Sequence, residues 1–436
     1  MATSLNYKHL AAILLPGLII RLLLAPYTSG SDIAQFAAFA DTMIKHGLEF
    51  FTYSDGKRFA SEGWPYPWPY VYGPLFIILL SMLRVLAPGK LKIYYDANGV
   101  YNVKIPTDWI IANKIVYILF DSIAAYEIYW IVKKLTGDDR KAVFTTILYY
   151  YNPLVIYISS IYGMFDQIVL SLLLAGLILF LKTESELSQA VVWGIAISIK
   201  PSIMIAMIPF YVYLAKEKGI VDSVKSIAAS VLLLLALFAP FMVIAPEGVT
   251  SYYHALEIVS TPNYYSPPAY SFNGLSSIAF YVWIHTGRNT SHYLSVWPIL
   301  FIPLYMATLY YTLKTRNPIL GMMLAQVTYT ATYWRVNHQY LVVTIGLVAI
   351  SLPLLMNNMG ELFAVLTIVM PALWPIFYPL SFWAQVHIAK PNHAIISLLQ
   401  AISLDIYDDL FYVYYSLALT FIQITLILVI LLDRNH

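Results

Sequence analysis

The segment LFYVYYSLALTFIQITLILVILL, residues 410–432, carries no Asp, Glu, Lys or Arg. A helix of about 20 apolar residues crosses the hydrocarbon core of a bilayer, so this segment predicts a transmembrane helix. Similar apolar runs recur along the chain. They are Ala11–Pro26, Ile110–Val132, Ile168–Leu181, Ser223–Ala245 and Trp297–Leu313. We therefore predict an all-α polytopic membrane protein with about 11–13 transmembrane helices.

The composition excludes several classes of protein. Of 436 residues, 60% are hydrophobic and 11% are charged, whereas soluble domains carry about 25% charged residues. The net charge of +2 is dispersed, so the sequence offers no basic stripe for nucleic acid and no acidic tail for a cationic partner. The absence of cysteine excludes disulfides and thiolate metal sites. The 37 Tyr, 10 Trp and 21 Phe exceed what interfacial belts use, and their flat rings suit sugar binding as well as helix packing.

The chain reads as a single integral membrane domain over residues 1–436. Met1–Leu10 holds only Lys8 as a charged residue, and no small-residue cleavage pattern follows, so the first apolar run is expected to remain as an anchor. Residues 9–245 are predicted to form an N-terminal catalytic helical module with an outer loop at 27–72. Residues 246–273 form a second outer loop, and 274–436 a C-terminal helical module.

The first outer loop opens with a pattern typical of an amphipathic helix. Apolar residues recur at helical spacing at positions 33, 36, 37, 40, 43 and 44. The opposite face carries Asp32, Gln35, Asp41, Thr42, Lys45 and His46. Such a helix can lie along the membrane surface. The tract WPYPWPYVYGP, residues 64–74, cannot be regular helix, because each proline removes a hydrogen-bond donor and restricts the residue before it.

Two further irregularities break the pattern of apolar spans. Residues 246–273 are predicted to be irregular, and two long aromatic outer loops suggest a roofed cavity. Ile199–Pro201 interrupts Ala190–Phe210, which is therefore either a kinked helix or two half-spans. The basic turn Lys133–Lys141 looks cytoplasmic, but so does the basic segment at residues 84–92 one span earlier, so one apparent span is expected to be re-entrant or split.

Ionisable side chains within apolar spans cost about 2.5–3.5 kcal/mol each near a helix centre, so each requires an explanation. Those within the predicted spans or at their ends are Arg21, Asp32, Asp121, Glu127, Asp166, Lys200 and Arg335. Asp121 and Glu127 are interpreted as partners of basic residues on neighbouring helices. Asp32 has two interpretations that can coexist: an acid of a capping box with Gln35, or a general base above the membrane. Asp166 opens an apolar run and is interpreted in the same two ways.

Basic residues at membrane depth indicate a site for phosphate. Lys200 precedes a proline, so it can pair with freed backbone carbonyls or with a lipid phosphate. In the segment 333–340, Arg335, His338 and Gln339 have the spacing of one helix face, where a guanidinium and an imidazole could bind phosphate. The alternative is a buried network that ties helices together. No metal-binding spacing, phosphate loop or Walker lysine is present, so we expect no metal, no cofactor and no nucleotide sugar.

These residues resemble the GT-C superfamily of membrane glycosyltransferases, in particular polyprenyl-phosphate-mannose-dependent mannosyltransferases related to the first mannosyltransferase of GPI synthesis. The matching pieces, in family order, are Arg21, residues 31–36, residues 40–47, residues 70–75, Asp121, residues 151–154, residues 163–167, residues 194–201 and residues 336–340. The resemblance covers roughly residues 10–350. It implies a GT-C-like helical bundle with amphipathic juxtamembrane helices in the first outer loop. The family's Asp-x-Asp motif is matched only at Asp32, because Gly30 and Ala34 stand at the neighbouring positions.

We therefore predict an inverting glycosyltransferase that moves a hexose, by resemblance mannose, from a polyprenyl (dolichyl) phosphate donor to a lipid-linked or membrane-proximal glycan acceptor. Asp32 is the predicted general base, and Arg335, His338 and Lys200 are predicted to bind the donor phosphate. Predicted substrate-binding residues are Asp166, Gln167, Asp41, Arg58, Gln339 and Tyr340. Membrane lipids are the other expected partners. The location is the cell membrane of a prokaryote such as an archaeon, or the endoplasmic reticulum of a eukaryote. The alternatives are a secondary transporter or lipid flippase, and a non-catalytic membrane subunit.

Overall fold

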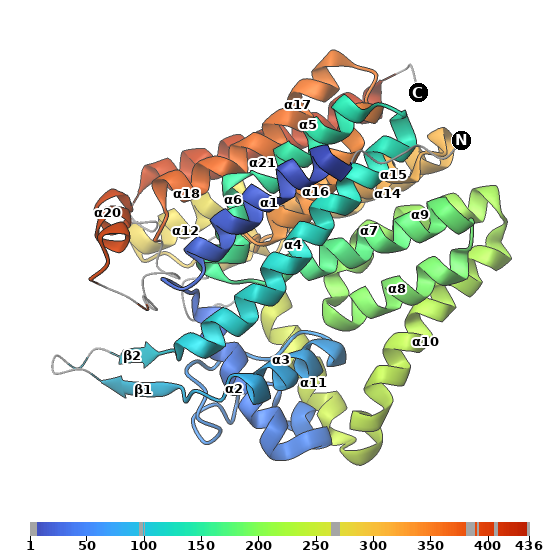
Figure 1. Ribbon diagram of the computed structural model, residues 1–436. Helices are drawn as coiled ribbons and strands as arrows, with labels where there is room; N and C mark the ends of the chain where they lie inside the picture. The colour runs from blue at the N-terminus through green and yellow to red at the C-terminus, as the bar shows by residue number, and fades with distance from the viewer. Residues whose placement is uncertain are drawn as a thin grey trace.

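The computed structural model describes residues 7–95, 99, 101–262, 271–380, 389, 392–404 and 409–433. Helices make up most of this part of the chain, and its one sheet is a two-stranded antiparallel hairpin (Figure 1). The elements are α1 (Tyr7–Leu24), α2 (Ser31–His46), η1 (Gly47–Tyr53), α3 (Pro74–Leu86), β1 (Lys92–Tyr95), β2 (Tyr101–Lys104), α4 (Thr107–Thr136), α5 (Asp139–Tyr150), α6 (Pro153–Ile156), η2 (Tyr157–Tyr162), α7 (Asp166–Thr183), α8 (Glu186–Ile199), η3 (Pro201–Ile203), α9 (Met204–Glu217), α10 (Ile220–Ile244), α11 (Glu247–Ser260), α12 (Gly274–Thr286), α13 (Ser291–Leu294), α14 (Trp297–Thr315), α15 (Pro318–Thr332), α16 (Tyr340–Ser351), η4 (Leu352–Leu354), α17 (Asn358–Val369), η5 (Met370–Leu373), α18 (Trp374–Phe377), α20 (Ala394–Ile402) and α21 (Leu410–Leu432).

Six helical stretches in the described ranges are long and apolar enough to cross a membrane. They are Thr107–Thr136, Asp166–Thr183, Ile220–Ile244, Ser291–Thr315, Asn358–Phe377 and Leu410–Leu432. Asp139–Tyr150 and Pro153–Tyr162 meet at a 51° bend and give a seventh if they are one broken span. This bend lies after both basic segments, and the unbroken helix α4 joins them, so the split element expected between the basic segments is not found there. Three apolar helices are shorter: Pro74–Leu86, Glu186–Ile199 and Tyr340–Leu354. The chain is thus an all-α, multi-pass membrane protein.

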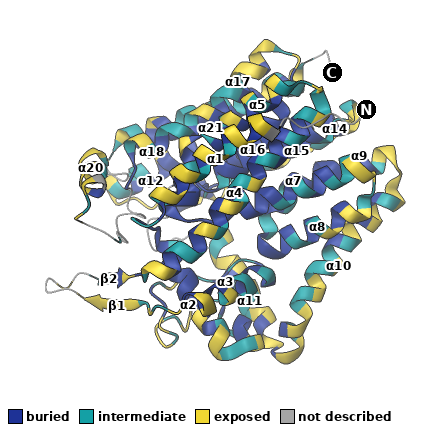
Figure 2. Ribbon diagram, in the orientation of Figure 1, coloured by how far each residue is buried: buried dark blue, intermediate teal, exposed yellow. Residues whose placement is uncertain are grey.

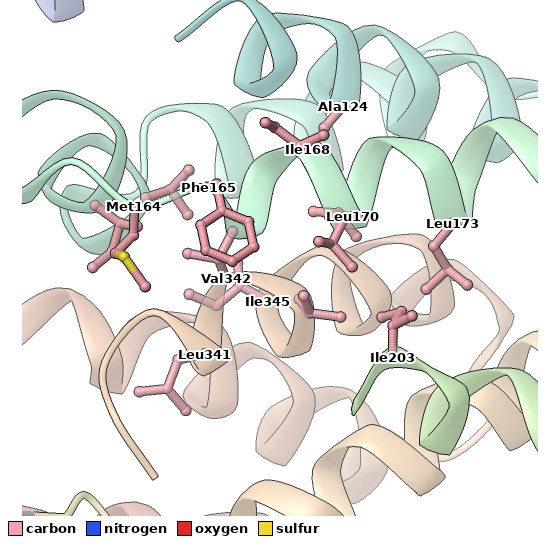
Figure 3. Close-up of a cluster of buried hydrophobic side chains, with 14 of the residues drawn as sticks. Ala124, Met164, Phe165, Ile168, Leu170, Leu173, Ile203, Leu341, Val342 and Ile345 are labelled. Atoms are coloured by element: carbon pink, nitrogen blue, oxygen red, sulfur yellow. The ribbon is translucent and has the colours of Figure 1, made fainter. Parts of the chain in front are cut away.

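The pattern of burial separates central helices from peripheral ones (Figure 2). In α7, 61% of the residues in its apolar stretch are buried, whereas in the apolar stretch of α10 only 17% are buried. Leu232, Leu235 and Val243 of α10 are more than half exposed, and exposed apolar surface of this kind fits contact with lipid. Around α7 the packing is close: Ile168 and Leu170 lie in one apolar cluster with Val342 and Ile345 of α16 (Figure 3). Ile168 and Val342 stand in the first turns of α7 and α16, so the cluster is adjacent in sequence to Asp166 and Gln339.

The described elements have two distinct ends. At one end, which we call the loop end, α2, α3, α11 and the β-hairpin gather below the helical bundle (Figure 1). At the other end His9 of α1 contacts Asp139 of α5, with 3.2 Å between its Nδ1 and the carboxylate, and Lys182 lies 4.9 Å from the ring of Trp130. Helix α4 has 30 residues, about 45 Å at 1.5 Å per residue, and therefore connects the two ends.

The first outer loop contains the predicted helix, as α2, but the helix does not lie open on a surface. Gln35 and Thr42, which the pattern assigns to a polar face, are buried. The Gln35 amide donates to the carbonyl of Trp68 (3.1 Å), and the Trp64 indole donates to Thr42 (2.8 Å). The Pro-aromatic tract, irregular as predicted, folds over α2 and covers it. The surface helix expected from periodicity is therefore a buried helix.

The second outer loop is more regular than predicted. Glu247–Ser260 is helical as α11, so the prediction of an irregular segment is wrong there; residues 263–270 of the same loop lie outside the described part. Helix α11 packs on the first loop: the Ser251 hydroxyl donates to the carbonyl of Thr52 (3.3 Å), and the rings of Phe51 and Tyr252 meet edge to face. The two outer loops thus form one layer.

Helices α8 and α9 run antiparallel, with Lys200 at the turn between them. The Nζ of Lys218, after α9, lies 3.0 Å from the carboxylate of Glu186 at the start of α8. The two helices therefore leave from and return to the same end of the molecule. Of the two interpretations of Ala190–Phe210, the kinked helix is wrong, because the break at Lys200–Pro201 reverses the chain. The two half-spans are found as two short helices, α8 and α9.

Candidate functional site

Four places where helices begin or end meet near the loop end. They are the start of α2, which holds Asp32; the start of α7, which holds Asp166; the α8–α9 turn at Lys200; and the connection 333–339 between α15 and α16. Lys200 pairs with Asp166, with 2.6 Å between its Nζ and Oδ1. The carboxyl of Asp32 is close enough to Arg335 and Asp166 to feel both charges. The structure therefore brings together predicted site residues from four segments.

Asp32 is oriented by a tyrosine and does not cap its helix. Helix α2 begins at Ser31 after Gly30, and no side chain caps it, so the capping-box interpretation of Asp32 is wrong. The hydroxyl of Tyr162 donates a hydrogen bond to Oδ2 of Asp32 instead. Burial raises the pKa of Asp32 above its usual 3.8, opposed by this hydrogen bond and by the charge of Arg335. A carboxylate with a raised pKa and a fixed direction suits proton abstraction.

Two glycines allow Tyr162 to reach Asp32. Gly30 contacts the ring of Tyr162 so closely that a Cβ at this position would overlap it, and the Gly30 amide donates to the Tyr162 carbonyl (2.6 Å). Gly163 has a φ of 87°, which L-residues rarely adopt. Tyr162 stands four residues before Asp166, and nothing local to it in the sequence indicates a partner 130 residues away.

His338 contributes a neutral ring. It is buried among aromatic side chains, with ring centroids 4.4 Å from Tyr162, 5.8 Å from Tyr157, 6.2 Å from Phe272 and 6.3 Å from Trp374. Burial lowers the pKa of His338 to about 3, so its imidazole is uncharged at neutral pH. It can therefore offer a hydrogen bond to a ligand, but no positive charge.

Arg335 lies in irregular chain, so the predicted shared helix face is wrong. Helix α15 ends at Thr332 and α16 begins at Tyr340. Between them, the Val336 amide donates to the Ser271 hydroxyl (2.9 Å) and the Phe272 amide to the Val336 carbonyl (2.8 Å). These bonds to a distant segment replace helical ones. The guanidinium of Arg335 is partly buried and has no ion pair within the described ranges, so it is free to bind an anion.

The Asp166–Lys200 pair borders a small pocket. Both side chains are nearly inaccessible, at 1% and 9% exposed, and Nζ of Lys200 also lies 4.3 Å from the centre of the Tyr340 ring. The pocket is lined by Asp166, Val169, Lys200, Ser202, Ile203, Gln326, Tyr329, Tyr340 and Val343. Asp166 follows Phe165 as the first residue of α7 and caps nothing, so its capping interpretation is also wrong. Lys200 pairs with this acid and not with freed carbonyls.

Several buried polar atoms around this site have no hydrogen-bond partner among the described residues. They are Oδ2 of Asp166, both amide atoms of Gln167, Nε of Arg335 and Oε1 of Gln339. An unsatisfied buried polar group costs about 1–3 kcal/mol, so such groups rarely persist without a role. Those on Asp166 and Gln167, next to the Lys200 ammonium, mark a place for a polar ligand or for water.

Two predicted residues are not brought into this group. Asp41 forms a bidentate pair with Arg84 of α3, at 2.6 and 3.0 Å. Arg58 is exposed on the first outer loop, 5.0 Å above the ring of Tyr53. Neither contacts a member of the group around Asp32 and Asp166, although both belong to the loop layer that covers it.

The other ionisable side chains within the spans have contacts of their own. Asp121 pairs with Arg21 at 2.6 Å with both side chains fully buried, as expected of a partner on a neighbouring helix. Glu127 has no basic partner in the described part of the chain and lies beside Ser171 instead, which corrects its interpretation. Lys114, which is not among the predicted intramembrane charges, is fully buried in α4 and contacts four backbone carbonyls. No set of three metal-ligating side chains occurs among the described residues.

No protein-family model matches this chain, and no curated protein matches its sequence.

Proposed function

We propose that this protein is a GT-C-like inverting glycosyltransferase, which moves a hexose, by resemblance mannose, from a polyprenyl (dolichyl) phosphate to a lipid-linked or membrane-proximal glycan at the outer face of the membrane. One observation carries the proposal: Asp32, a carboxylate fixed by a tyrosine, lies within electrostatic reach of Arg335, whose guanidinium has no ion pair with any residue that the structure describes. Such a site offers a base for the acceptor and a cation for the leaving phosphate. We also propose that the chain has the GT-C-like bundle of about 11–13 transmembrane helices that this resemblance implies.

The chemistry follows from the residues. Asp32 takes the proton of an acceptor hydroxyl as its oxygen attacks the anomeric carbon of the donor, on the side opposite the phosphate. The bond from the anomeric carbon to the phosphate oxygen breaks with its electron pair, and the polyprenyl phosphate leaves. Arg335 and Lys200 offset the charge that develops on the leaving phosphate. Inversion at the anomeric carbon follows from attack opposite the leaving group.

The depth of Lys200 supports a lipid-borne substrate. Helices α8 and α9 have 14 residues each, about 21 Å at 1.5 Å per residue. The hydrocarbon core is about 30 Å thick. Because α8 begins and α9 ends at the end opposite the loops, the turn at Lys200 stops short of the far surface. A cation at this depth can meet the phosphate of a lipid carrier whose chain lies in the bilayer.

The test compares two acids of the first outer loop in purified protein in nanodiscs, with synthetic polyprenyl-phosphate mannose as donor and host lipid extract as acceptor. Asp32→Asn should lower transfer by about 10²–10⁴-fold. Glu49→Gln, which alters an exposed carboxylate of the same loop, should retain transfer. Near-normal transfer by Asp32→Asn would overturn the proposal. Movement of unaltered donor across proteoliposomes, without transfer, would identify a flippase or transporter.

A further inference from the structure

Lys114 lies in α4, one of the helices that are apolar enough to cross a membrane, and lysines are rare in such helices. Its side chain is fully buried, eight positions into α4, and no carboxylate of the described residues pairs with it. Its Nζ instead donates to the carbonyls of Ala25 (3.0 Å), Ser160 (2.7 Å), Ile161 (2.9 Å) and Thr28. An ammonium held by four backbone carbonyls is hydrogen-bonded beyond its three protons, so some of these contacts are shared.

The four carbonyls belong to two segments that lead directly into the site. Ala25 and Thr28 lie between α1 and α2, just ahead of Asp32. Ser160 and Ile161 close η2, just ahead of Tyr162. Lys114 therefore holds two stretches of backbone, one shortly before Asp32 and one directly before Tyr162, whose hydroxyl binds the Asp32 carboxylate.

The segment before Asp32 and the segment that ends at Tyr162 are also joined directly by hydrogen bonds. The Thr28 hydroxyl donates to the Ile161 carbonyl (2.9 Å), the Gly30 amide donates to the Tyr162 carbonyl (2.6 Å), and the Tyr162 hydroxyl donates to Asp32. Helix α4 also holds α2 through the Trp109 indole, which donates to the Ile33 carbonyl (2.8 Å). The contacts of Lys114 are thus the first in a series of hydrogen bonds between the two segments, and the Tyr162–Asp32 hydrogen bond is the last.

We propose that Lys114 is a positioning residue for the glycosyl transfer proposed above: its ammonium fixes the two segments in register, so that the Tyr162 hydroxyl stays bonded to Asp32. The inference rests on that proposed function only for its effect on rate. The geometric claim, that loss of the ammonium at Lys114 breaks the Tyr162–Asp32 bond, holds whatever the reaction is. Each part is therefore tested by its own readout.

The geometric claim is tested by infrared titration of the Asp32 carboxyl, identified by difference against Asp32→Asn. Charged and titratable groups that face Asp32 are Tyr66, Tyr72, Tyr117, Tyr162, Asp166, Arg335 and Tyr340. All of them remain in Lys114→Met. This variant should raise the pKa of Asp32 by about one unit, a tenfold change in proton affinity, as should Tyr162→Phe. The double variant should show no further rise.

The double variant separates positioning from simple loss of charge. If Lys114 acted on Asp32 through its charge alone, Lys114→Met would raise the pKa of Asp32 equally with and without the Tyr162 hydroxyl. That result, or an unchanged titration in Lys114→Met, would overturn the inference. Lys134→Met is the matched control, because Lys134 is an exposed lysine of the same helix, and it should leave the titration as in the wild type.

The rate is tested separately in the transfer assay. Lys114→Met should lower kcat about tenfold and leave the KM for polyprenyl-phosphate mannose within about twofold, since Lys114 does not touch the phosphate-binding cations. Methylammonium should restore much of kcat to Lys114→Ala, whereas methanol should not. If the wild-type protein shows no transfer but the titrations of Asp32 give the expected result, the proposed function is wrong and the geometric role of Lys114 stands. If Lys114→Met and Lys114→Ala both fail to fold, and methylammonium does not restore the fold of Lys114→Ala, Lys114 has a role in folding alone and the inference is overturned.

Discussion

The Tyr162 hydroxyl and the Asp32 carboxylate are joined by a hydrogen bond across 130 residues of sequence. Asp32 belongs to the outer layer and Tyr162 to the bent element after α5, so the bond links that layer to the membrane-embedded bundle. A hydrogen bond to a charged group is worth about 1.5–3 kcal/mol. The bond therefore contributes both to the attachment of the loop and to the ionisation of its acid.

Tyr162→Phe tests the effect of this bond on pH dependence. Burial raises the pKa of Asp32, and the bond from Tyr162 opposes this rise. Because only ionised Asp32 can accept a proton, transfer is lost as the pH falls through the pKa of Asp32. Removal of the hydroxyl should shift this acid limb of kcat/KM upward by about one pH unit. An unmoved limb would show that another group limits the rate at low pH.

Asp32→Asn should not destabilise the protein at neutral pH. The folded-state pKa of Asp32 is above its usual value, so folding favours the protonated acid. This contribution is fully present below the unfolded pKa of about 3.9 and is lost as the pH rises through the folded pKa. Asparagine is neutral and keeps an acceptor for Tyr162, so the Tm of the variant at pH 7 should equal or exceed that of the wild type. The difference should shrink toward pH 4; a lower Tm at pH 7 would contradict the burial argument.

The Asp166–Lys200 pair should show strong coupling in a double-mutant cycle. Removal of one member leaves a buried charge without its partner, at a cost of about 3–5 kcal/mol. Asp166→Asn and Lys200→Met should therefore each lower the Tm, and the double variant should lose less than the sum of the two. The exposed pair Asp222–Lys225 is the control and should give little change. Additive losses would mean that the two buried groups act independently.

Arg335 should contribute to donor affinity. Its guanidinium has no ion pair in the described part of the chain, and it is close to Asp32 and Tyr340. Arg335→Gln should weaken binding of radiolabelled polyprenyl phosphate about 10–100-fold, the loss of one or two charge-assisted hydrogen bonds. Arg288→Gln, which changes an exposed arginine outside the site, should bind as the wild type does. Equal affinity of both variants would remove Arg335 from the phosphate site.

Gly30→Ala should disrupt the site through a single methyl group. The added Cβ would overlap the ring of Tyr162, so the ring must move away from Asp32. Transfer should fall about as far as in Tyr162→Phe, and the acid limb should shift in the same direction. Gly360→Ala is the matched control, since its Cβ would meet no atom closer than 3.9 Å. Wild-type activity in Gly30→Ala would show that the ring adjusts without leaving the carboxylate.

Sequence reasoning succeeded where structure follows from a local property of the chain. The crossings near residues 107–136, 166–183 and 410–432 are runs of apolar residues, and the solvent alone dictates their helical form. Helix α2 follows from the spacing of its apolar residues, and the break at Lys200 follows from Pro201. Each of these features is encoded within a few turns of helix.

The predictions that proved wrong depend on contacts with distant segments. The segment around Arg335 has helical spacing, but its backbone bonds with Ser271 and Phe272 instead of continuing the helix. Helix α11 is rich in tyrosine and β-branched residues with modest helix propensity, and it packs on η1 of the other loop. Tyr162 and Lys114 matter because of what lies opposite them, and no spacing along the chain encodes that.

The separation of Asp32 from Tyr162 has a consequence for biosynthesis. At about 5–20 residues per second, the 130 residues between them take about 7–26 seconds to synthesise. Throughout that interval the newly made α2 lacks the hydroxyl of Tyr162, and for the first part of it also the indole of Trp109 and the side chain of Lys114. Its apolar side chains, Phe36 and Phe39 among them, have no completed core to enter, and the nearest apolar phase is the lipid interface. The amphipathic pattern of α2 therefore suits the lipid interface until the bundle closes around the helix.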